Sequence, residues 1–293
     1  MIAVDDALSY EPSMMRRRRR VLPLPEQDPV IDAMDDELRA QVARTWQRRA
    51  HEELRVAMTF TGLCQELLAT GADPDVLAVV SRAVHDEVRH AEVCRALASR
   101  YARAEVPWPT GVPAEPARVA TDAVHAALRV VTLCCVTEAI ASSFLEASLA
   151  GARSPSARIA VGDLLADEVL HARVGWTFLA RQPQSVRTAI DANLLTLIQP
   201  VVRGWCDIGR VTLPEGAPEH GIPSMETTRA ATLSAMSEVV LPGFAALGFD
   251  VRATQTWLAD PEAGQAHAAK ALHEVDGGGS DHAFSPRQAP PSW

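Results

Sequence analysis

One hexamer occurs twice in this chain, and it limits the fold more than any other feature. Residues 86–91 read DEVRHA and residues 167–172 read DEVLHA. In each copy a glutamate and a histidine stand three residues apart, so in a helix both side chains lie on the same face. The glutamate of the first copy follows Gly71 by 16 residues, and that of the second follows Gly151 by 17. The two Glu-x-x-His pairs are therefore expected to face each other at one level of a helical bundle.

Four segments between residues 37 and 182 have the apolar pattern of helices, with apolar positions three or four residues apart. The turns at 71–74 and 151–155 contain Gly and Pro and are too short for anything but antiparallel hairpins. The linker over residues 104–115 can span roughly 40 Å when extended, about the length of a helix of roughly 27 residues. We therefore expect an all-α fold, a four-helix bundle of two antiparallel hairpins joined by a long crossover.

The apolar stripes of these helices carry charged residues that an apolar core does not tolerate. Both pairs, Glu87 with His90 and Glu168 with His171, fall on the stripes. A buried histidine can be satisfied by its neighbours and a glutamate can be a surface charge. Inward carboxylates without a partner, however, are too costly to keep. The sequence therefore predicts a cation between the two hairpins.

The first and third helices each offer one further acid. Glu53 lies on the stripe of the first helix with Glu52 beside it, and the choice between them stays open. Glu138 is the inward acid of the third helix. Measured from Gly151, Glu138 and Glu168 differ in level by about one helical turn, roughly 6 Å, and the sequence does not explain this offset. Four carboxylates and two imidazoles suit a pair of iron or manganese ions.

The duplicated Asp-Glu-Val-x-His-Ala with two partner glutamates resembles the ferritin-like di-iron carboxylate superfamily, in which two helices give a Glu each and two give Glu-x-x-His. The motif covers residues 37–182, and the stretch EVVLP at 238–242 is similar to bacterial ferritin-like domain proteins. The resemblance implies a ferritin-like bundle with two iron ions that react with dioxygen as co-substrate. The ligands that it implies are Glu53, Glu87, His90, Glu138, Glu168 and His171.

Departures from known relatives narrow the expected chemistry. Cys94 stands where ribonucleotide reductase small subunits have a radical tyrosine, and Leu164 where p-aminobenzoate N-oxygenases have a further histidine. The four-cysteine iron site usual in rubrerythrins is also missing. What remains is an oxidoreductase that hydroxylates, N-oxygenates or desaturates a small organic substrate with an external electron donor. A ferroxidase or rubrerythrin-like peroxide scavenger is the second hypothesis, and a scaffold or binding protein on the same frame is the third.

Residues beside the expected ligands are candidates for supporting roles. Asp86 and Asp167 can accept hydrogen bonds from the histidines, and Arg89 can neutralise carboxylate charge, although each is equally typical of an ordinary ion pair. Small and aromatic residues near the ligands can line a substrate cavity, and the small ones can equally serve close helix packing. The candidates for this lining are Phe60, Cys94, Ser142, Phe144, Gly175 and Phe178.

Composition restricts the partners and the compartment. The 28 basic residues against 37 acidic ones leave a net charge of −9, which disfavours nucleic-acid binding. No apolar run reaches the roughly 18 residues of a membrane span. Five cysteines without a Cys-x-x-Cys pair indicate a reduced, cytoplasmic protein. The expected partners are a small-molecule substrate, an external electron donor and a second copy in a homodimer.

Segments outside the bundle account for the rest of the chain. Residues 1–30, with the run Arg16–Arg20 and several prolines, are expected to form a disordered arm. Helical patterns within residues 184–260 predict additional C-terminal helices that pack on the bundle. Residues 261–293, rich in Gly and Pro, are expected to form a flexible tail.

Overall fold

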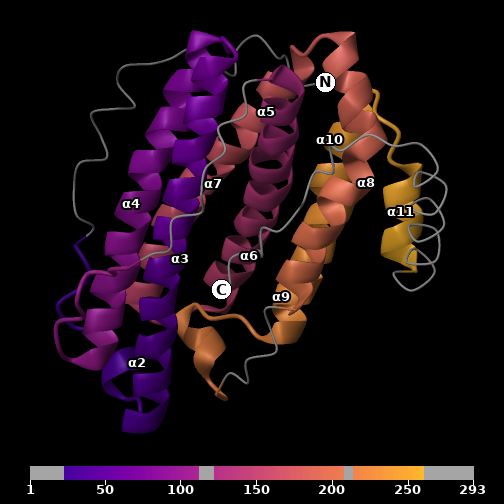
Figure 1. The fold of residues 1–293 in the computed structure, drawn as a ribbon. Helices are drawn as coiled ribbons and strands as arrows, with labels where there is room; N and C mark the ends of the chain where they lie inside the picture. The colour runs from indigo at the N-terminus through magenta and orange to yellow at the C-terminus, as the bar shows by residue number, and fades with distance from the viewer. Residues whose placement is uncertain (1–22, 112–121, 208–213, 261–293) are drawn as a thin grey trace.

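The chain is entirely helical in the part that the computed structural model describes, residues 23–111, 122–207 and 214–260 (Figure 1). The α-helices are α2 (Pro29–Asp32), α3 (Asp36–Ala69), α4 (Pro74–Ala102), α5 (Ala123–Val130), α6 (Glu138–Gly151), α7 (Pro155–Ala180), α8 (Gln184–Asp207), α9 (Met225–Ala235), α10 (Leu241–Ala246) and α11 (Arg252–Ala259). Two stretches are π-helical, η2 (Val131–Thr137) and η5 (Met236–Val240), and η4 (Ala217–His220) is a short 3-10 helix. The all-α prediction is confirmed, because these described residues contain no strand.

The two long hairpins begin new helices where the turn residues predict. α4 starts at Pro74 and α7 at Pro155, and the preceding residue, Asp73 or Ser154, accepts a hydrogen bond from a backbone N–H of the first turn. Proline fits the first position of a helix because its missing N–H would have no partner there. Four residues separate α3 from α4 and three separate α6 from α7, so each pair is antiparallel.

One end of the molecule gathers the start of α3, the end of α4 and the turn between α6 and α7. The Trp46 indole of α3 donates to the carbonyl of His220 in η4 at 3.2 Å, and the Tyr101 hydroxyl at the end of α4 lies 3.1 Å from Nδ1 of this histidine. The N–H of Arg153, in the turn after α6, donates to the carbonyl of Glu219 at 2.7 Å. α4 and α6 therefore run parallel, and the chain between α4 and α5 connects opposite ends of the molecule (Figure 1).

α5, η2 and α6 form one continuous helix, Ala123–Gly151, through the centre of the molecule. It is long and apolar enough to cross a membrane by length and composition, but 72% of its most apolar window is buried inside the protein. Such burial is typical of the core helix of a soluble protein. Its π-helical part ends directly before Glu138, and single π-helical turns inside α-helices are frequent at functional sites.

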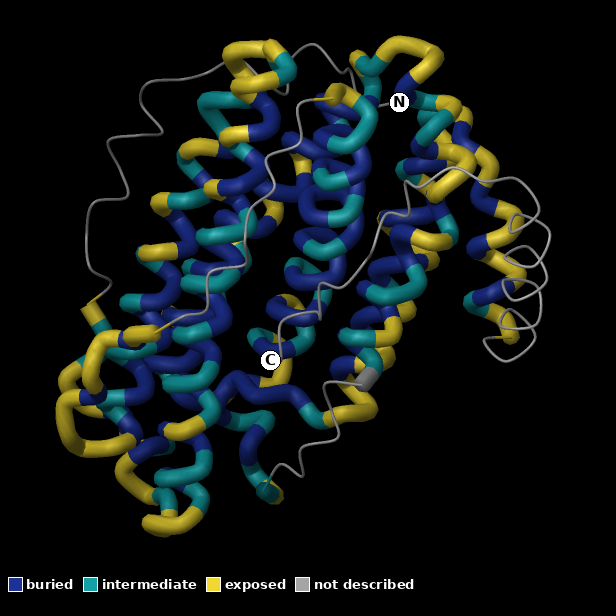
Figure 2. Tube along the Cα trace, in the orientation of Figure 1, coloured by how far each residue is buried: buried dark blue, intermediate teal, exposed yellow. Residues whose placement is uncertain are grey.

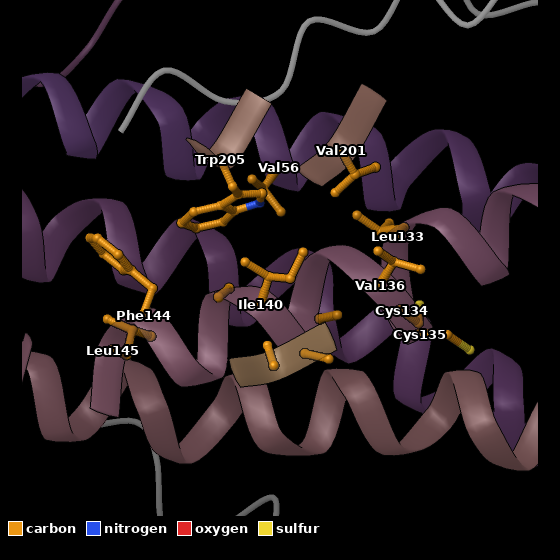
Figure 3. Close-up of a cluster of buried hydrophobic side chains, with 14 of the residues drawn as sticks. Val56, Leu133, Cys134, Cys135, Val136, Ile140, Phe144, Leu145, Val201 and Trp205 are labelled. Carbon is orange, nitrogen blue, oxygen red and sulfur yellow. The ribbon is translucent and has the colours of Figure 1, made fainter. Parts of the chain in front are cut away.

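The C-terminal helices cover the side of the molecule formed by α5, η2 and α6 (Figures 1 and 2). Trp205 of α8 is fully buried, and its ring centroid lies 5.4 Å from that of Phe144 in α6. Val56 of α3 and Ile140 of α6 belong to the same apolar cluster (Figure 3). α8 and α9 therefore extend the hydrophobic core beyond the two hairpins.

Asp28 ties the segment before α3 to the start of α7. Its carboxylate accepts hydrogen bonds from two N–H groups of α2, and Oδ2 also accepts from the Ser154 hydroxyl at 2.7 Å and the Ser156 N–H at 2.9 Å. Residues 28–30 thus belong to the folded part, although the sequence places them in the expected arm of residues 1–30. Residues 1–22, with Arg16–Arg20, and the expected tail of residues 261–293 lie outside the described residues.

Candidate metal centre

Six side chains from four helices converge between the hairpins. α3 contributes Glu53, α4 contributes Glu87 and His90, α6 contributes Glu138, and α7 contributes Glu168 and His171. They form two overlapping groups, Glu53–Glu87–His90–Glu168 and Glu87–Glu138–Glu168–His171, and within each group the ligand atoms lie within 4.8 Å of one another. All six residues are buried. Each group can hold a metal ion, and the two groups share Glu87 and Glu168.

The levels of these residues follow from where the helices end. Glu138 lies 13 residues before the last residue of α6, and Glu168 lies 13 residues after the first residue of α7. Glu53 and His90 are each 16 residues from the ends of α3 and α4 that meet at the other turn. The offset expected between Glu138 and Glu168 is therefore absent, because Gly151 is the last residue of α6 and not the centre of the turn.

Both histidines direct Nδ1 at the two shared glutamates. Nδ1 of His90 lies 3.3 Å from Oε2 of Glu87 and 3.4 Å from Oε1 of Glu168. Nδ1 of His171 lies 3.1 Å from Oε1 of Glu87 and 3.2 Å from Oε2 of Glu168. Burial alone would lower the pKa of His90, but the charge of Glu87 and hydrogen bonds to Glu168 and Glu87 raise the pKa to about 10. Without a metal, the imidazoles therefore supply positive charge among these carboxylates.

The aspartate of each hexamer supports the histidine of the other hexamer. Nε2 of His90 lies 3.4 Å from Oδ2 of Asp167, and Nε2 of His171 lies 3.5 Å from Oδ2 of Asp86. A histidine whose Nε2–H points at a carboxylate keeps the Nδ1 lone pair for a metal. The hydrogen bond to His171 and its charge hold the pKa of Asp86 below its usual value despite burial, which acts in the opposite direction.

Arginines fix these aspartates from the outer side. Arg89 donates to both Asp163 and Asp167 across the interface of α4 and α7, so its guanidinium pairs with these aspartates. Arg82 donates from Nε to Oδ2 of Asp86 at 3.2 Å. The sequence analysis assigned no role to Arg82 or Asp163. The signal was available, because each stands four residues before the aspartate of its hexamer and thus on the same helix face.

Buried carboxylate oxygens in the centre have no hydrogen-bond partner. These are Oε2 of Glu53, Oε1 of Glu87 and Oε1 of Glu138. Burial and the charge of Glu87 raise the pKa of Glu53 well above its usual value, and burial and the charge of Glu168 do the same for Glu138. Leaving such oxygens unpaired is costly. Two divalent cations would neutralise the four carboxylates and use these oxygens, and the oxygen and nitrogen donors suit iron or manganese.

Some of the residues expected to line a cavity directly contact the cluster. The ring centroids of Phe60 and His171 are 5.3 Å apart in an edge-to-face arrangement, and Sγ of Cys94 lies 3.9 Å from Oε1 of Glu53. Gly175 packs closely: a Cβ there would lie 2.7 Å from Cβ of Cys134. This contact supports the alternative that Gly175 serves close helix packing.

The other expected lining residues have contacts of their own. Ser142 is half-buried, and its hydroxyl donates to the carbonyl of Glu138 at 2.8 Å. Phe144 is buried against Trp205 of α8, and Phe178 is buried in the apolar core. These contacts do not define a substrate cavity.

The first helix resolves the choice between its two adjacent acids. Glu53 belongs to the cluster, whereas Oε2 of Glu52 lies 3.6 Å from Nη1 of Arg55. Arg49 is a buried cation that the sequence analysis left without a role, and its Nε lies 3.5 Å from Oε1 of Glu53. The signal for Arg49 was its place on the apolar stripe of α3, where an unpaired charge is not tolerated.

Comparisons with family models, with curated proteins and with solved structures gave no significant match for this chain.

Proposed function

We propose that this protein is a non-haem di-iron oxidoreductase that uses dioxygen to oxidise a small organic substrate, by hydroxylation, N-oxygenation or desaturation. The observation that carries the proposal is the pair of overlapping ligand groups that share Glu87 and Glu168. Shared carboxylates are what two adjacent ions need, since one bridging ligand can serve both. Manganese in place of one or both irons is compatible with the same donor atoms.

The ferritin-like frame is part of this proposal. Two antiparallel hairpins with α4 parallel to α6 match the connection of ferritin-like bundles, and each helix contributes the ligand type that this superfamily uses. The burial of the most apolar helix agrees with a cytoplasmic protein. An external electron donor is included because reductive use of dioxygen consumes electrons that the substrate alone does not always supply. A homodimer is the proposed assembly.

The chain's own residues would prepare the centre for its ions. Glu53 and His90 would serve one ion, Glu138 and His171 the other, and Glu87 and Glu168 both. When bound, the two ions would supply the redox equivalents for the reaction with dioxygen. Asp86 and Asp167 hold the imidazoles by Nε2, so no proton has to leave Nδ1 once the neutral tautomer is set.

Packing around the centre excludes water. The two imidazoles and the four carboxylates are at most 3% exposed, and Phe60 covers one side of His171. A dry site strengthens each electrostatic interaction of the ligands and protects a reactive oxidant from side reactions. The close contact of Gly175 with Cys134 keeps α7 against η2 on the side of Glu138.

The test is anaerobic loading of the metal-free protein with Fe(II), followed by rapid mixing with dioxygen. We expect two irons per chain, one for each ligand group, and an absorbance change that depends on iron. The double variant His90→Ala with His171→Ala should lose both, whereas His51→Ala, a half-buried histidine of α3 outside the cluster, should keep both. Failure of the wild type to bind iron, or iron binding without any reaction with dioxygen, would contradict the proposal.

The same experiment separates the proposed activity from its rivals. Dioxygen consumption that continues with a chemical reductant supports an oxidase or oxygenase. One oxidation event per bound iron with release of Fe(III) would indicate a ferroxidase, and turnover with hydrogen peroxide alone would indicate a scavenger. A scaffold function would instead survive the loss of both histidines.

A further inference from the structure

A buried arginine stands beside only one of the two terminal glutamates. Arg49 precedes Glu53 by one helical turn, and its Nε lies 3.5 Å from Oε1 of that glutamate. Its Cζ lies 5.0 Å from the ring centroid of Trp46 and 5.1 Å from that of Phe144. The side chain is 7% exposed. Two aromatic faces and an ion pair therefore hold this cation in place next to the cluster.

The corresponding place beside Glu138 is neutral. Four residues before Glu138 stands Cys134, which is fully buried. Burial, with a contribution from the charge of Glu138, raises the pKa of the Cys134 thiol, so this group carries no charge at neutral pH. The two halves of the centre share the same ligand types but differ by one fixed positive charge.

This difference also changes which oxygens are free. Oε1 of Glu53 faces Arg49, and Sγ of Cys94 lies 3.9 Å from the same oxygen. Oε2 of Glu53 has no hydrogen-bond partner and lies 3.9 Å from Nδ1 of His90. An ion between Glu53 and His90 would thus meet one available oxygen of Glu53 and, a few ångströms beyond it, a guanidinium. Like charges at such distances in a protein interior repel strongly.

Resting on the proposed dinuclear function, we propose that Arg49 makes the two metal positions unequal. The position at Glu138 and His171 fills first. The position at Glu53 and His90 binds its ion at least about tenfold more weakly, through Oε2 of Glu53 alone. Arg49 is a positioning residue in this proposal, since it acts on the metal through Glu53 and through its own charge.

The experiment adds Mn(II) in steps to the metal-free full-length protein and follows bound ions by electron paramagnetic resonance. In the wild type, the first equivalent should give the signal of isolated Mn(II), and the second should convert it to that of a coupled pair. Two single-site variants separate the positions: His90→Ala leaves the Glu138 position intact, and His171→Ala leaves the Glu53 position intact. His90→Ala should bind Mn(II) at least about tenfold more tightly than His171→Ala.

Removal of the cation should then act on one position only. Arg49→Met should raise the Mn(II) affinity about tenfold in the His171→Ala background and leave it unchanged in the His90→Ala background. A purely structural role for Arg49 would instead lower the affinity in both. Arg49→Gln serves as the second variant if Arg49→Met does not fold. The matched control is Arg129→Met, which removes another buried Arg–Glu pair, with Glu66 at 2.7 Å, that is not part of the ligand cluster.

The outcomes separate this inference from the proposed function. Equal Mn(II) affinities in the two single-site variants, or a loss of affinity on Arg49→Met, would overturn the role of Arg49 while the dinuclear centre stands. Absence of Mn(II) and Fe(II) binding by the wild type would overturn both. An equal effect of Arg129→Met and Arg49→Met would also overturn the inference, because it would show that loss of any buried ion pair changes the affinity.

Discussion

Replacement of Gly175 by alanine should destabilise the protein, although alanine favours helices. A Cβ at this position of α7 would lie 2.7 Å from Cβ of Cys134 and 2.8 Å from Sγ of Cys135. Both neighbours are buried in the η2 helix, so α7 and η2 would have to move apart. Overpacking of this kind costs about 1–3 kcal/mol, whereas the gain in helix propensity is about 1 kcal/mol. We expect a net loss on the order of 1 kcal/mol.

Gly162 in the same helix provides the matched control for this prediction. A Cβ there would meet no atom within 4 Å, so Gly162→Ala should stabilise the protein by roughly 0.5–1 kcal/mol. Urea unfolding of the metal-free wild type and of both variants gives the free energies to compare. Equal stabilisation by the two alanines would refute the reasoning. It would show that Gly175 borders open space, as a cavity-lining role requires.

Three further predictions concern the metal centre. Asp167→Asn should lower metal affinity by roughly 10–100-fold in competition with a chelator, because Nε2 of His90 loses a charged acceptor; unchanged affinity would mean that Asp167 serves only Arg89. Removal of metal by a chelator should lower the free energy of unfolding by about 2.7 kcal/mol relative to free ion at a hundredfold excess over Kd; equal melting temperatures would contradict binding to the folded state. Without metal, stability should fall as pH rises from 6.5 to about 10, because folded His90 keeps a proton over this interval that an unfolded histidine releases. The raised pKa values of Glu53 and Glu138 act in the same direction above 4.5, and a stability that increases with pH over this interval would contradict the assignment.

Local sequence signals were sufficient where the physics is local. Apolar residues three or four apart, Pro74 and Pro155 at helix starts, and short turns predict α3, α4, α6 and α7. The spacing in the hexamer predicts that glutamate and histidine share a helix face, and the structure brings all six expected ligands together. The relative level of Glu138 and Glu168 was missed because it depends on the residue at which α6 ends, which the turn sequence does not specify to within one helical turn.

The remaining features depend on contacts between distant parts of the chain. Arg49 is held by Phe144 of another helix, so its burial follows from tertiary packing. The π-helical stretch η2 packs against Gly175 of α7, and a helical apolar pattern does not distinguish a π-helix from an α-helix. Asp28 caps the start of α7 across more than a hundred residues of sequence, at Ser156. No local pattern near Asp28 predicts that partner.

The exchange of partners between the two hexamers has a consequence for how the protein assembles. Asp86 on α4 supports His171 on α7, and Asp167 on α7 supports His90 on α4. Neither hairpin by itself contains a histidine with both its glutamate cluster and its aspartate support. The binding energy of the ions would therefore stabilise the docking of the two hairpins, not the folding of either one. Loss of metal should separate the hairpins as cooperative units before either of them unfolds.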